Sequence, residues 1–275
     1  MSFRRAMCAV ALCGVAPAAA SAQSRLVEGG YEITYLGFAG FRIDFTARFD
    51  GNRYDIESHA YKEGVMRAVT LRYEGRNRAW GRFSLRDGAQ PSGGSLSIIV
   101  DDKSRTWLAL YGPGGQLSET HNPPWKPPQP KDEMSEADKI GTLDPLTATL
   151  MVVMKGDDAC RQTAPSNDGE RRIDVTLRQV GTESPQGAGV PEAKGNILVC
   201  EIYSKRVAGY FDAPPEEAES KKERPMKIWM AHLDDTPFRF PVKLEASPGF
   251  GTAHGHLLYF RERPLTEEEK VAMQR

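Results

Sequence analysis

Residues 142–154 read TLDPLTATLMVVM, and this stretch carries no charge apart from Asp144. Asp144 followed by Pro145 is typical of a helix start: aspartate caps exposed N–H groups, and proline at the first helical position has no N–H to satisfy. Four aliphatic residues recur at helical spacing: Leu143, Leu146, Leu150 and Val153. The opposite face is also uncharged, so we expect a helix over residues 144–154 that is buried on more than one side. It is too short to span a bilayer, which needs about 20 apolar residues.

The N-terminus has the pattern of a cleaved signal peptide. Arg4 and Arg5 precede a short apolar core at residues 6–15, and a small-x-small site ends at Ala22. We therefore expect a signal peptide at residues 1–22 and an exported mature chain that begins at Gln23. A membrane anchor is the weaker interpretation, because the apolar run is too short to span a bilayer.

Charge argues against one class of partner. The 275-residue chain has a net charge of −1, and removing Arg4 and Arg5 lowers its 36 basic residues to 34 against 37 acidic ones, which gives −3. A nucleic-acid-binding domain is expected to be basic. We therefore expect no nucleic-acid partner, and no segment of the mature chain is apolar enough to span a membrane.

Two of the four cysteines, Cys160 and Cys200, remain after cleavage. An exported protein with two cysteines usually pairs them, because the compartments outside the cytoplasm are oxidising. The sequence therefore predicts a Cys160–Cys200 disulfide. Two free buried thiols, or a reactive cysteine, would also fit the sequence.

Most of the mature chain has the alternation of antiparallel strands. Residues 41–49 alternate apolar and polar side chains, and residues 54–60 return after the turn at residues 50–52, which predicts a half-buried hairpin. Further strands are expected at residues 31–35, 78–85, 95–100, 107–111, 172–178, 197–203, 226–232, 238–244 and 255–260. Residues 65–73 are ambiguous between strand and helix.

The segments between these strands are expected to be turns and loops. Gly93 with Gly94 and residues 101–104 are turn candidates, and residues 181–189 form a glycine-rich loop. Residues 112–131 are rich in proline and glycine, so we expect a surface loop that cannot join a sheet. Residues 214–224 are mostly charged, which indicates a solvated tip or short helix. Thr266 and Glu269 have capping-box spacing, so residues 264–275 are expected to form a short helix or tail.

This layout predicts the fold class and the domain organisation. About ten strands with one buried helix favour a mainly β protein with a single strongly curved antiparallel sheet, a half-barrel or β-spiral. We expect residues 23–263 to form one domain around the helix.

No pattern in the sequence points to catalysis or to a cofactor. His254 and His256 would share one face of a strand and could hold a metal, but no third ligand has suitable spacing. The chain has no nucleophile elbow, phosphate-binding loop or HExxH motif. Asp234 and Asp235 fall in an expected turn, where aspartates cap backbone N–H groups. We therefore expect no enzyme, no cofactor and no metal site.

Several stretches, in this order, resemble one protein family: YEITYLGFAGFRIDFTARFDGNRYDIESHA from Tyr31, the helix start DPLTATL, a cysteine followed by GERRIDVTL, a second cysteine in a following strand, and IWMAHLDDTPFRFPVKLEAS from Ile228. The family is catalogued as domain of unknown function 3108, and its members are periplasmic proteins of Gram-negative bacteria. The resemblance implies a periplasmic location and no known activity. By analogy, the fold is similar to the curved sheets of periplasmic lipoprotein carriers, in which helices plug an apolar concavity.

These observations favour a non-enzymatic periplasmic protein that holds a lipid, an acyl chain or another hydrophobic ligand in a curved sheet. In this hypothesis Leu146, Leu150 and Val153 face the sheet. The expected cavity residues are Phe41, Phe45, Met151, Met154, Phe238 and Phe240. An ordinary filled core explains the same residues equally well. Two further hypotheses are an envelope scaffold that binds a periplasmic protein partner, and a hydrolase without a recognisable motif.

Overall fold

The structure is a computed structural model. It describes residues 24–68, 72–84, 88–112, 116–121, 134–169, 171–209, 225–234, 236–247 and 251–273. The expected signal peptide, most of the proline-rich segment and the charged residues 214–224 lie outside these ranges.

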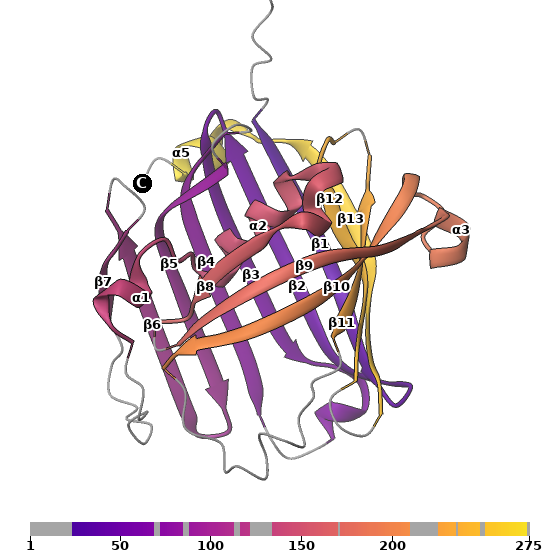
Figure 1. Ribbon diagram of the computed structural model, residues 1–275, viewed down its shortest axis with the longest axis horizontal. Coiled ribbons are helices and arrows are strands. Elements are labelled where there is room, and N and C mark those ends of the chain that lie inside the picture. The colour runs from indigo at the N-terminus through magenta and orange to yellow at the C-terminus, as the bar shows by residue number, and fades with distance from the viewer. Residues whose placement is uncertain are drawn as a thin grey trace, which may run out of the picture.

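One antiparallel sheet of thirteen strands makes up most of the described chain, and it curves strongly without closing (Figure 1). The predicted fold class is therefore confirmed. The strands are β1 (Arg25–Tyr35), β2 (Phe38–Asp50), β3 (Arg53–Lys62), β4 (Tyr73–Ser84), β5 (Gly88–Val100), β6 (Lys103–Tyr111), β7 (Leu117–His121), β8 (Thr163–Asn167), β9 (Arg172–Glu183), β10 (Lys194–Ala208), β11 (Met226–His232), β12 (Arg239–Ala246) and β13 (Ala253–Pro264).

The strand order explains the shape of the sheet. The chain begins at the centre with β1, meanders outward to the edge strand β7, crosses to the other edge at β8, and meanders back until β13 pairs with β1. The crossing segment contains α1 (Glu136–Lys139), α2 (Pro145–Met154) and the 3₁₀-helix η2 (Gly156–Arg161). Figure 1 shows that this crossing places α2 within the concavity, with β9 and β10 running in front of β1–β3.

Alternation along the strands assigns each side chain to one face. In β2, Ile43, Phe45 and Ala47 point into the concavity. The alternate residues are polar or charged and lie on the convex face, where Arg42 pairs with Asp44 at 3.0 Å. The pleat therefore concentrates apolar side chains beneath α2 and ion pairs on the outside.

The N-terminus of α2 is anchored by its cap. The Asp144 carboxylate accepts hydrogen bonds from the backbone N–H groups of Leu146 (3.0 Å) and Thr147 (2.9 Å). Gly94 of β5 lies against this cap: a Cβ added to it would stand 3.0 Å from Asp144 Cβ. The absence of a side chain at Gly94 thus lets the helix start pack directly on the sheet.

The predicted turn at Gly93 and Gly94 is wrong, because both residues lie inside β5. A Cβ at Gly93 would fall 2.1 Å from the Trp80 ring, so this glycine makes room for a side chain of the neighbouring strand. The glycines mark close packing here, and the chain does not reverse.

Parts of the expected loops are also structured. The segment Leu117–His121, predicted to stay outside the sheet, pairs with β6 as the edge strand β7. It contains no proline, so its N–H groups can join the ladder. The glycine-rich stretch is strand as far as Glu183 and then forms α3 (Pro185–Ala188). Of the ambiguous residues 65–73, the first three lie in the 3₁₀-helix η1 (Gly64–Arg67) and Tyr73 begins β4, while residues 69–71 lie outside the described ranges.

The chain just beyond β8 meets β6 at one point. Gly169 lies so close to Trp107 that an added Cβ would be 1.6 Å from the indole nitrogen. Arg105 and Asp168 approach to 3.9 Å beside it. These contacts connect β6, which lies beside the edge strand β7, with the chain just after β8, the other edge strand of the sheet.

Candidate functional site

A cavity of about 400 Å³ lies between α2 and the concave face of the sheet. Its walls come from α2, from β1–β3 and from β11–β13. We call this space the apolar cavity, because all but a few of its lining side chains are aliphatic or aromatic. Aromatic side chains on its wall include Phe45, Phe49, Phe238 and Phe240.

Aromatic contacts hold these walls in place. Phe45 stacks on Tyr31 with ring centroids 5.8 Å apart, and Phe238 lies 6.4 Å from Phe49. Phe240 packs on the ring of Phe260 at 4.7 Å. Such pairs fix ring orientations, so the cavity is bounded by ordered surfaces.

The few polar groups on the wall are mostly neutral and bonded. The Tyr31 hydroxyl donates to the Pro241 carbonyl at 2.9 Å, and burial raises the pKa of this phenol, which keeps it neutral. The Thr149 hydroxyl donates to the Pro145 carbonyl within α2 at 2.9 Å. Among the described residues on the wall, Lys243 alone is cationic, and its ammonium group lies 4.4 Å from the Trp229 ring centroid. The cavity is therefore suited to apolar groups.

Three of the six residues expected in a cavity lie on this wall: Phe45, Phe238 and Phe240. Phe41 instead forms a T-shaped ring contact with Tyr73, with ring centroids 5.4 Å apart. Met151 and Met154 are half-buried against the core and are not on the wall.

The orientation of α2 differs from the one expected. Leu146, Leu150 and Val153, expected to pack on the sheet, line the cavity together with Thr149. The helix is apolar almost all round, so its pattern did not indicate which face borders a space. Ile33 and Leu244 also line the cavity although neither was among the expected cavity residues; Leu244 alternates with Phe240, which was.

A buried polar cluster supports the start of α2. The hydroxyl groups of Tyr54 and Thr147 lie 2.8 Å apart, beside Asp144, which is 2% exposed. Burial raises the pKa of the Asp144 carboxyl to about 6, although the hydrogen bonds that it accepts from backbone N–H groups lower the pKa. Its Oδ2 atom and the Tyr111 hydroxyl have no hydrogen-bond partner among the described residues. The helix start is thus held by a carboxyl group with an unusually high proton affinity.

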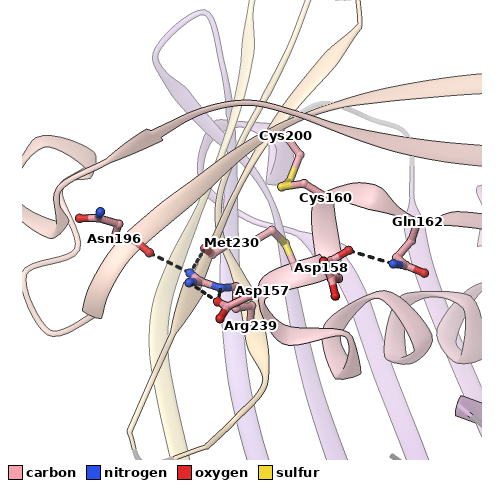
Figure 2. Close-up of a disulfide and its surroundings, with 8 residues drawn as sticks. All are labelled: Asp157, Asp158, Cys160, Gln162, Asn196, Cys200, Met230 and Arg239. Atoms are coloured by element: carbon pink, nitrogen blue, oxygen red, sulfur yellow. Dashed lines mark hydrogen bonds and ion pairs between the residues drawn. A yellow bond between two sulfur atoms is a disulfide. The ribbon is translucent and has the colours of Figure 1, made fainter. Parts of the chain in front are cut away.

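The other end of α2 is fixed by a disulfide and an ion pair (Figure 2). Cys160 of η2 is bonded to Cys200 of β10, with Cα atoms 5.4 Å apart, which confirms the predicted disulfide. Arg239 donates to Asp157 from Nε (2.9 Å) and Nη2 (2.7 Å), and from Nη1 to the carbonyl of Asn196 (2.8 Å). The hydrogen bond from Arg239 lowers the pKa of the Asp157 carboxyl, and the hydrogen bond with His232 lowers it to a smaller extent. Both ends of α2 are therefore tied to the sheet.

The remaining candidate residues do not gather into a site. The rings of His254 and His256 stack with centroids 6.3 Å apart. Among the described residues, no group of three or more His, Cys, Asp or Glu side chains could hold a metal ion. Within the same ranges, no helix is long and apolar enough to cross a membrane.

A second hollow, of about 600 Å³, lies beside η2 and β9. Polar side chains dominate its lining, among them Arg161, Gln162, Thr163 and Arg178. It lacks the convergent apolar surface of the cavity under α2.

Residues 30–257 match the family described as Protein of unknown function (DUF3108). The chain belongs to this family. The matched region runs from β1 into β13, so the DUF3108 domain contains the curved sheet, α2 and both paired cysteines. This confirms the resemblance found in the sequence. No curated protein matches the chain.

Proposed function

We propose that this DUF3108 protein is a non-enzymatic periplasmic protein that binds an apolar ligand, a lipid or an acyl chain, between α2 and the curved sheet. The apolar cavity is the observation that carries this proposal. Its volume of about 400 Å³ falls in the range of about 300–1,000 Å³ that small-molecule sites occupy.

Incomplete burial on the wall supports an occupant. Ile33, Ile43 and Leu244 line the cavity yet are only half-buried. A ligand that covers their exposed surface gains about 25 cal/mol for each Å² of apolar area removed from water. A fully packed core would have covered these side chains already.

The periplasmic location is supported by two observations. Residues 1–22 have the pattern of a signal peptide, and the Cys160–Cys200 disulfide is of the kind that persists in oxidising compartments. N-terminal sequencing of the protein from a periplasmic extract should begin at Gln23. Full-length protein retained in the cytoplasm would contradict the proposal.

A fluorescent fatty-acid analogue tests the binding site. Thr149 lies on the cavity wall but is exposed, so Thr149→Trp should fill the space without removing a packed side chain. The matched control is Lys155→Trp, which places the same side chain at the C-cap of α2, away from the cavity.

Wild-type protein and Lys155→Trp should bind the analogue with similar affinity, and Thr149→Trp should bind it at least tenfold more weakly. Circular dichroism and thermal melts show whether all three proteins fold. Binding that Thr149→Trp leaves unchanged would contradict a ligand site under α2.

A further inference from the structure

The strands β12 and β13 are joined along only part of their length. Backbone pairing connects Lys243–Ala246 of β12 with Ala253–His256 of β13, which is four residue pairs. The remaining residues of β12, 239–242, pair only with β11, and those of β13, 257–264, pair only with β1. Both segments belong to the described chain, and no backbone pairing links them. We call this break between residues 239–242 and 257–264 the seam.

Two β-bulges mark the level at which the strands part. The pairing of β12 with β11 skips Val242, and the pairing of β13 with β1 skips Leu258. Each of these extra residues lies one or two positions beyond the last pair between β12 and β13, Lys243 with His256. A bulge bends its strand and interrupts regular pairing. The seam therefore begins where both strands bend.

Side chains, and not a backbone ladder, bridge the seam. The Tyr31 hydroxyl of β1 donates to the Pro241 carbonyl of β12 at 2.9 Å. Phe240 of β12 packs on Phe260 of β13 with ring centroids 4.7 Å apart. Rotation of side chains breaks these two contacts, whereas parting two paired strands breaks a series of N–H···O bonds. The sheet is therefore easier to open at the seam than between the fully paired strands β1, β2 and β3.

The apolar cavity reaches the seam. Only every second residue of β2 lines the cavity, as expected for a strand that meets it with one face. From β12, however, the wall takes neighbouring residues: Phe240 with Pro241, and Lys243 with Leu244. Neighbouring side chains point to opposite faces of a strand, so the cavity extends past the face of β12 to one of its edges. The other edge is paired with β11 at these residues, which leaves the edge at the seam.

Apolar side chains lie on the outer side of the seam as well. Leu258, the extra residue of the β13 bulge, is 46% exposed and is not on the cavity wall. Leu257 before it and Phe260 after it are partly buried against the hydrophobic core. A short part of β13 therefore carries apolar side chains both at the surface and against the core, next to the cavity.

We propose that the seam between β12 and β13 is the portal through which the apolar ligand enters and leaves the cavity, and that Tyr31 and Phe240 keep it closed. This inference rests on the proposed function, because it concerns how a ligand reaches that site. Passage at the seam needs rotation of side chains and breaks no strand pairing. An apolar molecule also stays in contact with apolar side chains along this path.

A bulky group at the outer side of the seam tests the portal. Leu258→Cys, modified with a bulky maleimide, should slow both association and dissociation of the fluorescent fatty-acid analogue by about tenfold or more in stopped-flow measurements. The matched control is Val271→Cys in α5 (Glu267–Ala272), which is 49% exposed and carries the same modification. It should exchange the analogue at wild-type rates. Cys160 and Cys200 are bonded to each other and buried, so the reagent modifies only the introduced cysteine.

Tyr31→Phe should have the opposite effect. It keeps the ring but removes the hydroxyl that bridges the seam, so both rate constants should rise several-fold. The matched control is Tyr61→Phe, which removes a hydroxyl that donates to Asp44 on the convex face at 2.8 Å and should leave both rate constants unchanged. A defect confined to the cavity wall would raise the dissociation rate alone, and that result would count against the portal.

A third modified variant, Leu36→Cys, marks another way out of the concavity. Leu36 lies in the turn between β1 and β2 with φ 52°, is 59% exposed, and follows Ile33 of the cavity wall by three residues. Modification there should leave both rate constants unchanged. Slower exchange with modified Leu36→Cys, or equal rates for modified Leu258→Cys and Val271→Cys, would overturn the portal and leave the ligand site standing. Wild type that does not bind the analogue would refute the ligand site and the portal together.

Discussion

The guanidinium group of Arg239 lies 2.7 Å from the carboxylate of Asp157, three residues before the disulfide-bonded Cys160. Arg239 is 8% exposed at its side chain and Asp157 is 81% exposed. The same guanidinium group also donates to the backbone carbonyls of Asn196 and Met230. It therefore anchors η2 to three strands from a buried position.

Replacement of the buried partner should cost more stability than replacement of the exposed one. Arg239→Met leaves the carbonyls of Asn196 and Met230 without this donor, and we expect a loss of about 2–4 kcal/mol. Asp157→Asn keeps an acceptor near Arg239 in a solvated position, so we expect a loss of about 1 kcal/mol or less. Urea denaturation measures both. Equal losses would show that the carbonyl bonds contribute little.

The disulfide should contribute strongly to stability. It joins residues 40 positions apart, and closing a loop of that length contributes about 4 kcal/mol in the chain-entropy model. The double variant Cys160→Ser/Cys200→Ser should lose stability of that order in urea denaturation. Alkylation and mass mapping without reductant provide the direct check, since two freely alkylated cysteines would exclude the bond in the isolated protein.

Asp144 should make stability depend on pH in the direction opposite to most carboxyl groups. Its pKa in the folded protein is about 6, above its ordinary value of 3.8, so the folded state binds its proton more tightly. The stability due to this group is present below pH 4 and is lost as pH rises to about 6. Relative to Asp144→Asn, which preserves an N-cap, wild type should lose about 1–3 kcal/mol between pH 4 and pH 7.

Asp157 provides a control, because its contribution to stability should change with pH in the opposite direction to that of Asp144. The pKa of Asp157 is lowered by Arg239, so its stabilising effect is present at neutral pH and is lost as pH falls through its folded pKa. Relative to Asp157→Asn, wild type should therefore gain stability with rising pH. A parallel pH dependence for the two comparisons would contradict the buried, proton-binding role of Asp144.

The two faces of α2 should respond differently to truncation. Leu150 is buried and lines the cavity, so Leu150→Ala should cost about 2–5 kcal/mol and change the affinity for the fatty-acid analogue several-fold. Met151 is half-buried away from the cavity, so Met151→Ala should cost less and leave the affinity unchanged. Thermal melts and analogue titrations measure both. An affinity change confined to Met151→Ala would place the ligand on the other face.

Local chemistry made much of the fold predictable. Alternation in residues 41–49 assigned apolar and charged side chains to opposite faces of a strand, which favoured one sheet with a single core face. Asp144 and Pro145 have the residue types of a helix start, and Asp144 caps α2. The pairing of Cys160 with Cys200 was predicted because the chain is expected to be exported to an oxidising compartment and only two cysteines remain after cleavage. The strand and helix-cap patterns each lie within a few neighbouring residues, and the disulfide prediction did not require knowledge of the three-dimensional structure.

Features that depend on distant packing were not predictable. Gly93 and Gly94 lie inside a strand. Glycine is needed there because Trp80 and Asp144 occupy the space that larger side chains would need, and no local sequence pattern reveals those neighbours. The cavity face of α2 was hidden for a related reason, since Leu150 and Met151 are similarly apolar. The positive φ of Leu36 in the turn between β1 and β2 is a local feature, but leucine is not a residue that such turns favour, so the sequence did not indicate it.

The most direct test of the account is the identity of what the protein carries. Protein purified from the periplasm of its own host without detergent should be extracted with organic solvent and analysed by mass spectrometry, beside Thr149→Trp prepared identically. An apolar molecule should accompany wild type in stoichiometric amount and should be strongly depleted in Thr149→Trp. No enriched molecule in wild type, or equal amounts in both proteins, would contradict a ligand site between α2 and the sheet.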